Sequence, residues 1–244
     1  MTKGIIFILT LGVFSIINTE MGVVGILPLV AEEYGVTVAT AGLLVSLFAL
    51  IVAFAGPTMP LLFSRINRKK TMLLVLGVFT GCNLISAFAT TFPVVVAARV
   101  IPAFFQPVYV SMAMSVAGAS VSKEEAPKAV SKVMIGVSAG MVLGVPIVSY
   151  IANVTSLRMG MLFFAAVNAV ALIATVIVVP DLPVKEKLSY GSQLSVLKEG
   201  RVWLAILGVM CLNGSIFGMY SYLSDYLENV THLSSGIVSA LLLV

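Results

Sequence analysis

A carboxylate inside an apolar stretch is the first feature of this sequence that could do chemistry. Glu20 lies in the mostly apolar run 5–30, which is long enough to cross a bilayer because a spanning helix needs ~20 residues at ~1.5 Å each. A charged side chain at that depth costs about 2.5–3.5 kcal/mol on insertion scales. We therefore expect Glu20 to line a water-filled cavity, to have a partner, or to bind and release a proton. A structural carboxylate paired within a helix bundle is the alternative.

Arg99 is a second charged residue within an apolar run, and it could partner Glu20. Counted from the outer ends of their runs, Arg99 lies ~11 Å deep and Glu20 ~14 Å deep at ~1.5 Å per residue, so a pair between them is geometrically possible. Protonation of the acid would compete with that pairing. Arg99, Gln106 and Tyr109 share one helical stripe because they are spaced by seven and three residues. The stripe predicts polar groups that face a cavity; scattered polar residues used in packing are the alternative.

The composition indicates which elements must hold these residues. The 244-residue chain is 60% hydrophobic and only 10% charged, with a mean hydropathy of +1.13, whereas soluble domains are about 25% charged. The sequence therefore predicts an all-α polytopic membrane protein. Because the last apolar run continues to Val244, we expect the chain to be a fragment of a longer protein. Runs of spanning length occur at 5–30, 40–63, 71–91, 94–119, 130–152, 158–179 and 202–226, and an eighth begins near residue 234.

The positions of lysine and arginine predict the orientation in the membrane. Twelve of the fourteen basic residues lie before the first run or in alternate connections between runs. Because basic residues favour the cytoplasmic side, we expect a cytoplasmic N-terminus, and the net charge of +4 is no sign of nucleic-acid binding. A longer polar connection predicts three parts: an N-terminal six-helix bundle (1–179), a central cytoplasmic loop (180–200) and the start of a truncated C-terminal bundle (201–244).

The first run carries a motif that resembles a known family. The segment Thr19-Glu20-Met21-Gly22-Val23-Val24-Gly25-Ile26-Leu27-Pro28 is similar to the T-E-F-x-x-x-G-L-L-P motif of the sugar-efflux (arabinose-exporter-like) branch of the major facilitator superfamily, close to its drug:proton antiporters. The resemblance extends over nearly the whole chain. It implies a partial major facilitator fold, with about seven and a half of twelve transmembrane helices, in which Glu20 couples transport to protons.

Arg99 supports the same resemblance. It matches the arginine of the family motif R-x-x-Q-G, although Pro102 and Ala103 stand where Gln and Gly are expected. The implied role of Arg99 is to modulate the titration of Glu20.

A cytoplasmic loop motif follows the second run. The segment 60–70 resembles the family pattern G-x-L-a-D-R-x-G-R-[RK], with Ser64 and Asn67 in place of Asp and the second Gly. Asn67 can adopt the left-handed turn conformation that this glycine provides, but Ser64 cannot supply the missing negative charge. A basic loop that only sets the orientation is the alternative reading. The basic residues of the implied gating loop are Arg65, Arg68 and Lys69.

Glycines four residues apart form the most specific motif, in the fifth run. Gly136, Gly140 and Gly144, followed by Pro146, resemble the G-x-x-x-G-x-P antiporter motif. Such glycines make a flat helix face that another backbone can approach closely. The resemblance implies a hinge and a seal against the second half of the protein. Close helix packing is the alternative.

The sequence contains no Walker loop, dinucleotide fingerprint or nucleophile triad, so neither an enzyme nor an ATP-driven pump is predicted. No cofactor or metal is expected either. The resemblance implies a proton-coupled secondary transporter of a bacterial inner membrane that exports small molecules by alternating access. Its partners would be a small-molecule substrate, protons and the lipid bilayer, without nucleic acid, and it would act as a monomer.

The substrate class stays open between a sugar and a lipophilic drug. A sugar site would need several hydrogen-bonding groups, which Asn18, Gln106 and Tyr109 could provide, whereas a drug site would need a larger apolar pocket. The alternative function is a non-transporting membrane module, such as a receptor or an assembly subunit, or an inactive truncated transporter.

Overall fold

The computed structural model describes residues 2–182, 198–212 and 215 of the chain. Contacts divide the chain into two compact units, Met1–Lys187 and Leu188–Val244, and the division falls within the predicted loop 180–200. The second unit contributes the apolar helix Gly200–Leu212. The rest of the predicted seventh run and the whole eighth run lie outside the described residues.

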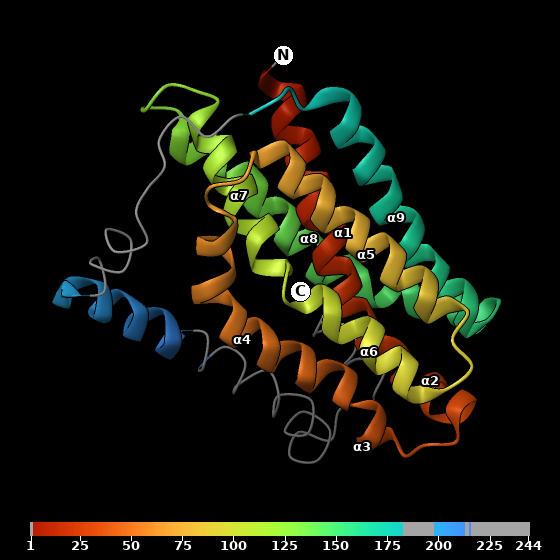
Figure 1. Cartoon of the computed structure of the whole chain (residues 1–244). Coiled ribbons are helices and arrows are strands. Elements are labelled where there is room, and N and C mark those ends of the chain that lie inside the picture. The colour runs from red at the N-terminus through yellow and green to blue at the C-terminus, as the bar shows by residue number, and fades with distance from the viewer. Residues whose placement is uncertain (1, 183–197, 213–214, 216–244) are drawn as a thin grey trace, which may run out of the picture. The chain divides into compact units, whose positions relative to one another are not determined.

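In the described part of the first unit, all regular elements are helices (Figure 1). Its elements are α1 (Thr2–Gly22), η1 (Val23–Ile26), α2 (Leu27–Tyr34), α3 (Val38–Ala41), α4 (Leu43–Phe63), α5 (Arg68–Ala87), α6 (Phe92–Ala103), α7 (Gln106–Ala119), α8 (Ala126–Val154) and α9 (Leu157–Val178).

Six helical stretches in the described residues are long and apolar enough to cross a membrane. They confirm the first six predicted runs, with ends shifted by a few residues. The stretches are Gly4–Tyr34, Val38–Phe63, Arg68–Ala87, Phe92–Ala119, Ala126–Val154 and Leu157–Val178.

The first stretch is interrupted in its second half, and the fourth near its middle. In the first, the α-helix tightens into the 3-10 turn η1, and Pro28 in the first turn of α2 has no N–H with which to continue the ladder of hydrogen bonds. The stretch ends at Gly35, whose φ of 61° is left-handed and favours glycine. In the fourth stretch, α6 ends just after Pro102, and α7 begins with Pro107 in its first turn.

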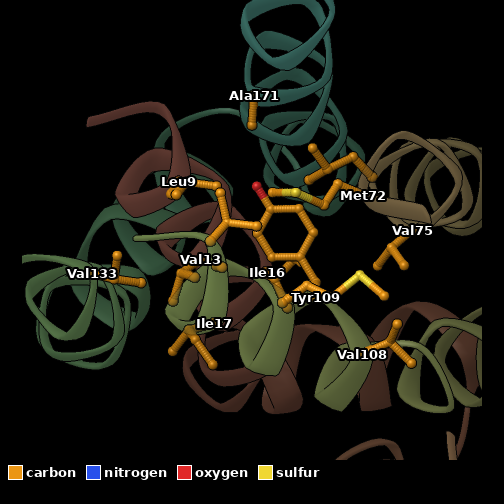
Figure 2. Close-up of a cluster of buried hydrophobic side chains, with 14 of the residues drawn as sticks. Leu9, Val13, Ile16, Ile17, Met72, Val75, Val108, Tyr109, Val133 and Ala171 are labelled. Carbon is orange, nitrogen blue, oxygen red and sulfur yellow. The ribbon is translucent and has the colours of Figure 1, made fainter. Parts of the chain in front are cut away.

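Helix α1 is the centre of the first unit, with α7, α8 and α9 packed around it. Figure 2 shows side chains from α1 that meet those of α5, α7, α8 and α9 in one apolar cluster, with the ring of Tyr109 in its middle. The labelled members of this cluster are Leu9, Val13, Ile16, Ile17, Met72, Val75, Val108, Tyr109, Val133 and Ala171.

The outside of the first unit is also apolar. Phe54 is 72% exposed and Ile177 is 76% exposed, as expected where lipid chains are the solvent. Because lipid is as apolar as the helix surfaces, helices in a membrane associate through close packing and polar bonds. Small residues at helix contacts therefore matter here more than apolar burial.

The glycines of α8 provide such a contact with α1. Gly136 lies against the carbonyl oxygen of Thr10 and 3.2 Å from Phe14 N, both measured from where a Cβ would stand. Gly140 and Gly144 approach Ile17 and Asn18 in the same way. All three glycines thus pack within the first unit, and Pro146 lies on the exposed side of α8. A hinge or seal against the second unit stays a prediction.

Replacement of Gly136 by alanine should force α1 and α8 apart, since the new methyl group meets rigid backbone atoms. We expect the Gly136→Ala protein to lose about 1–3 kcal/mol of stability, measured as a lower midpoint of thermal unfolding in detergent. Gly81→Ala is the matched control, because a Cβ at Gly81 meets nothing within 4 Å and alanine favours helix. Equal losses in the two variants would contradict the close-contact account.

Candidate functional site

Glu20 lies near the end of α1, just before the interruption at η1. Its side chain is half-buried, and its Oε2 atom accepts a hydrogen bond from Gln106 Nε2 at 3.2 Å. Gln106 is the first residue of α7 and is 9% exposed. This contact brings together the two interrupted helices.

Arg99 reaches the same point from α6, with only 2% of its surface exposed. Its guanidinium donates from Nη1 to the carbonyl of Thr19 at 2.7 Å and from Nη2 to the carbonyl of Glu20 at 3.2 Å. It also lies over the ring of Phe48, 5.3 Å from the centroid, as cation–π contacts require. The structure thus brings Arg99 close to Glu20, but its hydrogen bonds are to main-chain carbonyls rather than to the carboxylate.

The interruption of α1 explains these acceptors. In an α-helix the carbonyls of Thr19 and Glu20 would bond the N–H groups four residues later, which belong to η1. The tighter 3-10 turn changes that pattern to a spacing of three residues. In a membrane, a helix break is tolerated only where neighbouring groups satisfy the backbone. Arg99 does so here for Thr19 and Glu20, and Ser149 Oγ donates to Gly25 O within η1 at 3.0 Å.

Thr19 is the centre of a buried hydrogen-bond cluster. Its hydroxyl accepts from Asn168 Nδ2 at 2.8 Å and from Asn83 Nδ2 at 3.3 Å, and it donates to the carbonyl of Ser15 at 3.0 Å. A hydroxyl offers one donor and two acceptor sites, so this one is fully used. The cluster ties α1 to α5 and α9 directly beside Glu20.

The sequence does not predict that this cluster belongs to the site. Asn83 and Asn168 were visible as amides within apolar runs, a pattern that indicates a bond between helices. No sequence pattern predicts that Thr19 bonds to other helices, since a threonine in a membrane helix usually bonds a carbonyl of its own helix.

Asn18 and Tyr109 lie in helix contacts, unlike the cavity positions predicted for them. Asn18 faces the Gly144 position of α8, and both polar atoms of its amide lack hydrogen-bond partners. Tyr109 lies within the apolar cluster of Figure 2, and its hydroxyl is also unpartnered. Of the three residues predicted to bind substrate, only Gln106 adjoins Glu20.

The loop motif at 60–70 has a different geometry from the predicted one. Asn67 has φ −48° and ψ 126°, which is not left-handed, because its side chain caps α5 by accepting from Lys70 N at 3.2 Å. Its Nδ2 atom donates to Asp181 Oδ1 at 2.6 Å. A carboxylate therefore does reach this loop, from beyond α9 rather than from position 64.

Two basic residues of the loop also contact the end of α9 and the residues that follow it. The main-chain N–H of Arg68 donates to Leu182 O at 3.2 Å, and Lys69 Nζ donates to Val176 O at 2.9 Å. Arg65 is exposed. The start of α5 is thus joined to the end of α9 within the first unit, while a gating role for Arg65, Arg68 and Lys69 stays a prediction.

Removal of the Thr19 hydroxyl should leave the buried amide of Asn83 without its acceptor, whereas Asn168 Nδ2 keeps the carbonyls of Phe164 and Ser15. We expect Thr19→Val to lower stability by about 1–3 kcal/mol, the usual cost of a buried unpaired group, measured as a lower unfolding midpoint in detergent. In the control Thr80→Val, the lost hydroxyl bonds only Leu76 O of its own helix, so little should change. A stability loss no larger than that of the control would contradict the inference that Thr19 is the centre of the buried hydrogen-bond cluster.

Comparison with known proteins identifies the family. The profile of the Major Facilitator Superfamily matches residues 9–244. The MFS-type transporter YtbD of Bacillus subtilis, itself uncharacterised, is 33% identical over 96% of this chain and 60% of its own length. A probable sugar efflux transporter of Helicobacter pylori is 24% identical over 98% of this chain and 61% of its own length. The chain therefore spans about three fifths of the length of these relatives.

A solved structure agrees on the fold. The peptide transporter POT, crystallised with sulfate, superposes with a TM-score of 0.68 at 14% identity, over 91% of this chain and 49% of that one. The family profile matches residues 9–244, and six helical stretches in the described residues are long and apolar enough to span a membrane. This chain therefore belongs to the Major Facilitator Superfamily.

Proposed function

We propose that this chain is part of a proton-coupled secondary transporter that exports small molecules by alternating access. The observation that carries the proposal is the placement of Glu20. Its half-buried carboxylate bonds Gln106 and lies close enough to Arg99 for their charges to attract, at the point where two spanning helices are interrupted. An acid in a membrane span marks a proton or substrate path by default.

Protonation would change the contacts of Glu20 in a defined way. The ionised carboxylate can only accept hydrogen bonds, whereas the protonated acid also donates one and has no charge to attract Arg99. Arg99 would keep its bonds to the carbonyls of Thr19 and Glu20 in either case. Proton binding would thus loosen the link between α1 and α7 without removing the support of the helix break.

The moving parts are proposed from the same contacts. The glycine face of α8, formed by Gly136, Gly140 and Gly144 with Pro146 beyond it, would let α1 shift along α8 with few side chains in the way. The loop with Arg65, Arg68 and Lys69 would act as the gate on the cytoplasmic side. The N-terminus would face the cytoplasm of a bacterial cell from its inner membrane, and the transporter would act as a monomer.

The substrate is proposed to be a sugar or a lipophilic drug. A sugar is supported by the name of the Helicobacter pylori relative and by the unpartnered polar atoms of Asn18 and Tyr109. These atoms would gain partners in a conformation that opens the bundle to water or to a hydroxylated substrate. A large apolar drug would bind less readily among the side chains of the cluster in Figure 2, because those side chains are buried against one another.

Substitution of Glu20 tests the proposal. In proteoliposomes with L-arabinose and ethidium as probes, the complete protein should release protons in step with export of one of them. Glu20→Gln should reduce this coupled flux by at least about tenfold, as expected for a group that carries the proton. Glu32→Gln, an exposed acid on the same spanning stretch, should leave it unchanged.

Two outcomes would count against the proposal. Coupled flux that persists in Glu20→Gln would remove this residue from proton coupling. The absence of flux for every probe in the unmodified protein would favour the alternative of a non-transporting membrane module.

A further inference from the structure

A phenylalanine from a further span lies against the guanidinium of Arg99. Phe48 belongs to α4, which packs beside α6 (Figure 1), and its ring centroid is 5.3 Å from Arg99 Cζ. Phe48 and Arg99 are each 2% exposed. A cation over an aromatic ring is attracted to it, and the attraction is stronger where water is excluded. The ring of Phe48 therefore helps to hold the guanidinium in the place where it lies.

The nitrogens of the guanidinium are unequally bonded. Nη1 and Nη2 donate to the carbonyls of Thr19 and Glu20, whereas Nε is buried without a hydrogen-bond partner. Buried donors nearly always have an acceptor, so each exception needs an explanation. An arginine placed only for stability is expected to use this donor as well.

The carboxylate of Glu20 is an acceptor that Arg99 leaves unused. The two charges lie close enough to attract, and hydrogen bonds between arginine and a carboxylate are among the stronger ones in proteins. The carboxylate nevertheless bonds Gln106, while Arg99 bonds main-chain carbonyls. The guanidinium thus stays on the main chain despite a nearby opposite charge, and the ring of Phe48 lies against it there.

Arg99 is the charged group that acts on Glu20 among the described residues. Other charged side chains of the surrounding helices are at positions 32, 33, 68–70, 128, 132 and 158. Each is ten or more positions along its span from Glu20 itself or from the residue that contacts Asn18 or Thr19, which is ~15 Å or more. The thiol and phenol groups of these helices carry no charge near pH 7. They belong to Tyr34, Cys82, Tyr109 and Tyr150.

We propose that Phe48 is a positioning residue for proton coupling, which keeps Arg99 on the carbonyls of the helix break and off the carboxylate of Glu20. The inference rests on the proposed role of Glu20 as the group that carries the proton. Arg99 attracts the ionised carboxylate without pairing with it directly. An incoming proton would have to break a direct ion pair, so Phe48 leaves Glu20 free to take up a proton and release it.

Carbodiimide labelling of Glu20 tests the proposal. Dicyclohexylcarbodiimide is apolar and reacts with protonated carboxyl groups, so the extent of labelling at different pH values reports the protonation of Glu20. The complete protein in detergent would be labelled over a range of pH, and peptide mass spectrometry would measure the adduct at Glu20.

Phe48→Leu removes the aromatic ring and keeps an apolar side chain. We expect its labelling midpoint to move to lower pH by about one unit, because the proton then competes with a direct pair between Arg99 and Glu20. Coupled export of the transport probes should shift along the pH axis in the same direction. Phe48→Tyr keeps the ring and should retain the labelling midpoint of the unmodified protein.

Phe79→Leu is the matched control. Phe79 of α5 is fully buried in the same apolar cluster as Phe48, and no cation of the described residues is found over its ring. Both leucine variants should lower the midpoint of thermal unfolding to a similar extent, whereas only Phe48→Leu should shift the labelling curve. If Phe48→Leu does not fold, Phe48→Met keeps more of the side-chain volume and should show the same shift.

Two labelling results would overturn the inference. Equal midpoints in Phe48→Leu and Phe79→Leu would show that the ring has no effect on Glu20. A shift of Phe48→Leu to higher pH would show that Phe48 holds Arg99 toward the carboxylate rather than away from it.

The two proposals fail in different ways. Coupled flux that persists in Glu20→Gln would overturn the transport proposal and, with it, the role of Phe48 in coupling. Coupled flux that is lost in Glu20→Gln, together with an unshifted labelling curve in Phe48→Leu, would overturn the inference about Phe48 alone.

Discussion

The satisfaction of polar groups within an apolar bundle is the constraint on which this structure depends. A membrane offers no water to an unpaired carbonyl or amide, so a break in a spanning helix needs a donor from another helix. Arg99 provides that donor to the carbonyls of Thr19 and Glu20. Because the guanidinium always remains charged, the support of the break does not depend on the protonation state of Glu20. The helix interruption would therefore persist through the proposed protonation and deprotonation of Glu20.

Thr19 and Glu20 are adjacent in sequence but have different surroundings. The Thr19 hydroxyl is buried and fully bonded to α5 and α9, whereas Glu20 is half-buried and bonded through Gln106 to α7. The Thr19 side chain bonds α1 to α5 and α9, and the Glu20 side chain meets α7 through a single hydrogen bond. A change at Glu20 would thus alter the α1–α7 side and leave the α1–α9 side in place. This asymmetry is what the proposed mechanism requires of a coupling residue.

The sequence predicted the spanning helices and the close packing at α8 because both follow from local patterns. Hydropathy over some twenty residues defines a span, and glycines four residues apart share one helix face. The approach of Arg99 to Glu20 followed from counting depth along two helices. The carbonyl acceptors of Arg99 could not be predicted in this way, since they depend on the 3-10 turn η1. Nor could the link from Asn67 to Asp181, because contacts between residues 114 positions apart depend on how α5 and α9 pack, which local sequence does not encode.

Asn18 and Tyr109 lie in similar surroundings in this conformation, and their role in a substrate cavity stays a prediction. A polar residue on a helical stripe was expected to face water, yet both side chains are enclosed by packed helices and leave polar atoms unbonded. Each such atom raises the free energy of this conformation by about 1–3 kcal/mol. A conformation that hydrates them gains that amount back, and a shift of ~5.5 kcal/mol reverses a two-state population from 1:99 to 99:1. In the proposed mechanism, hydration of these groups at the contacts of α1 would offset part of the cost of opening the bundle.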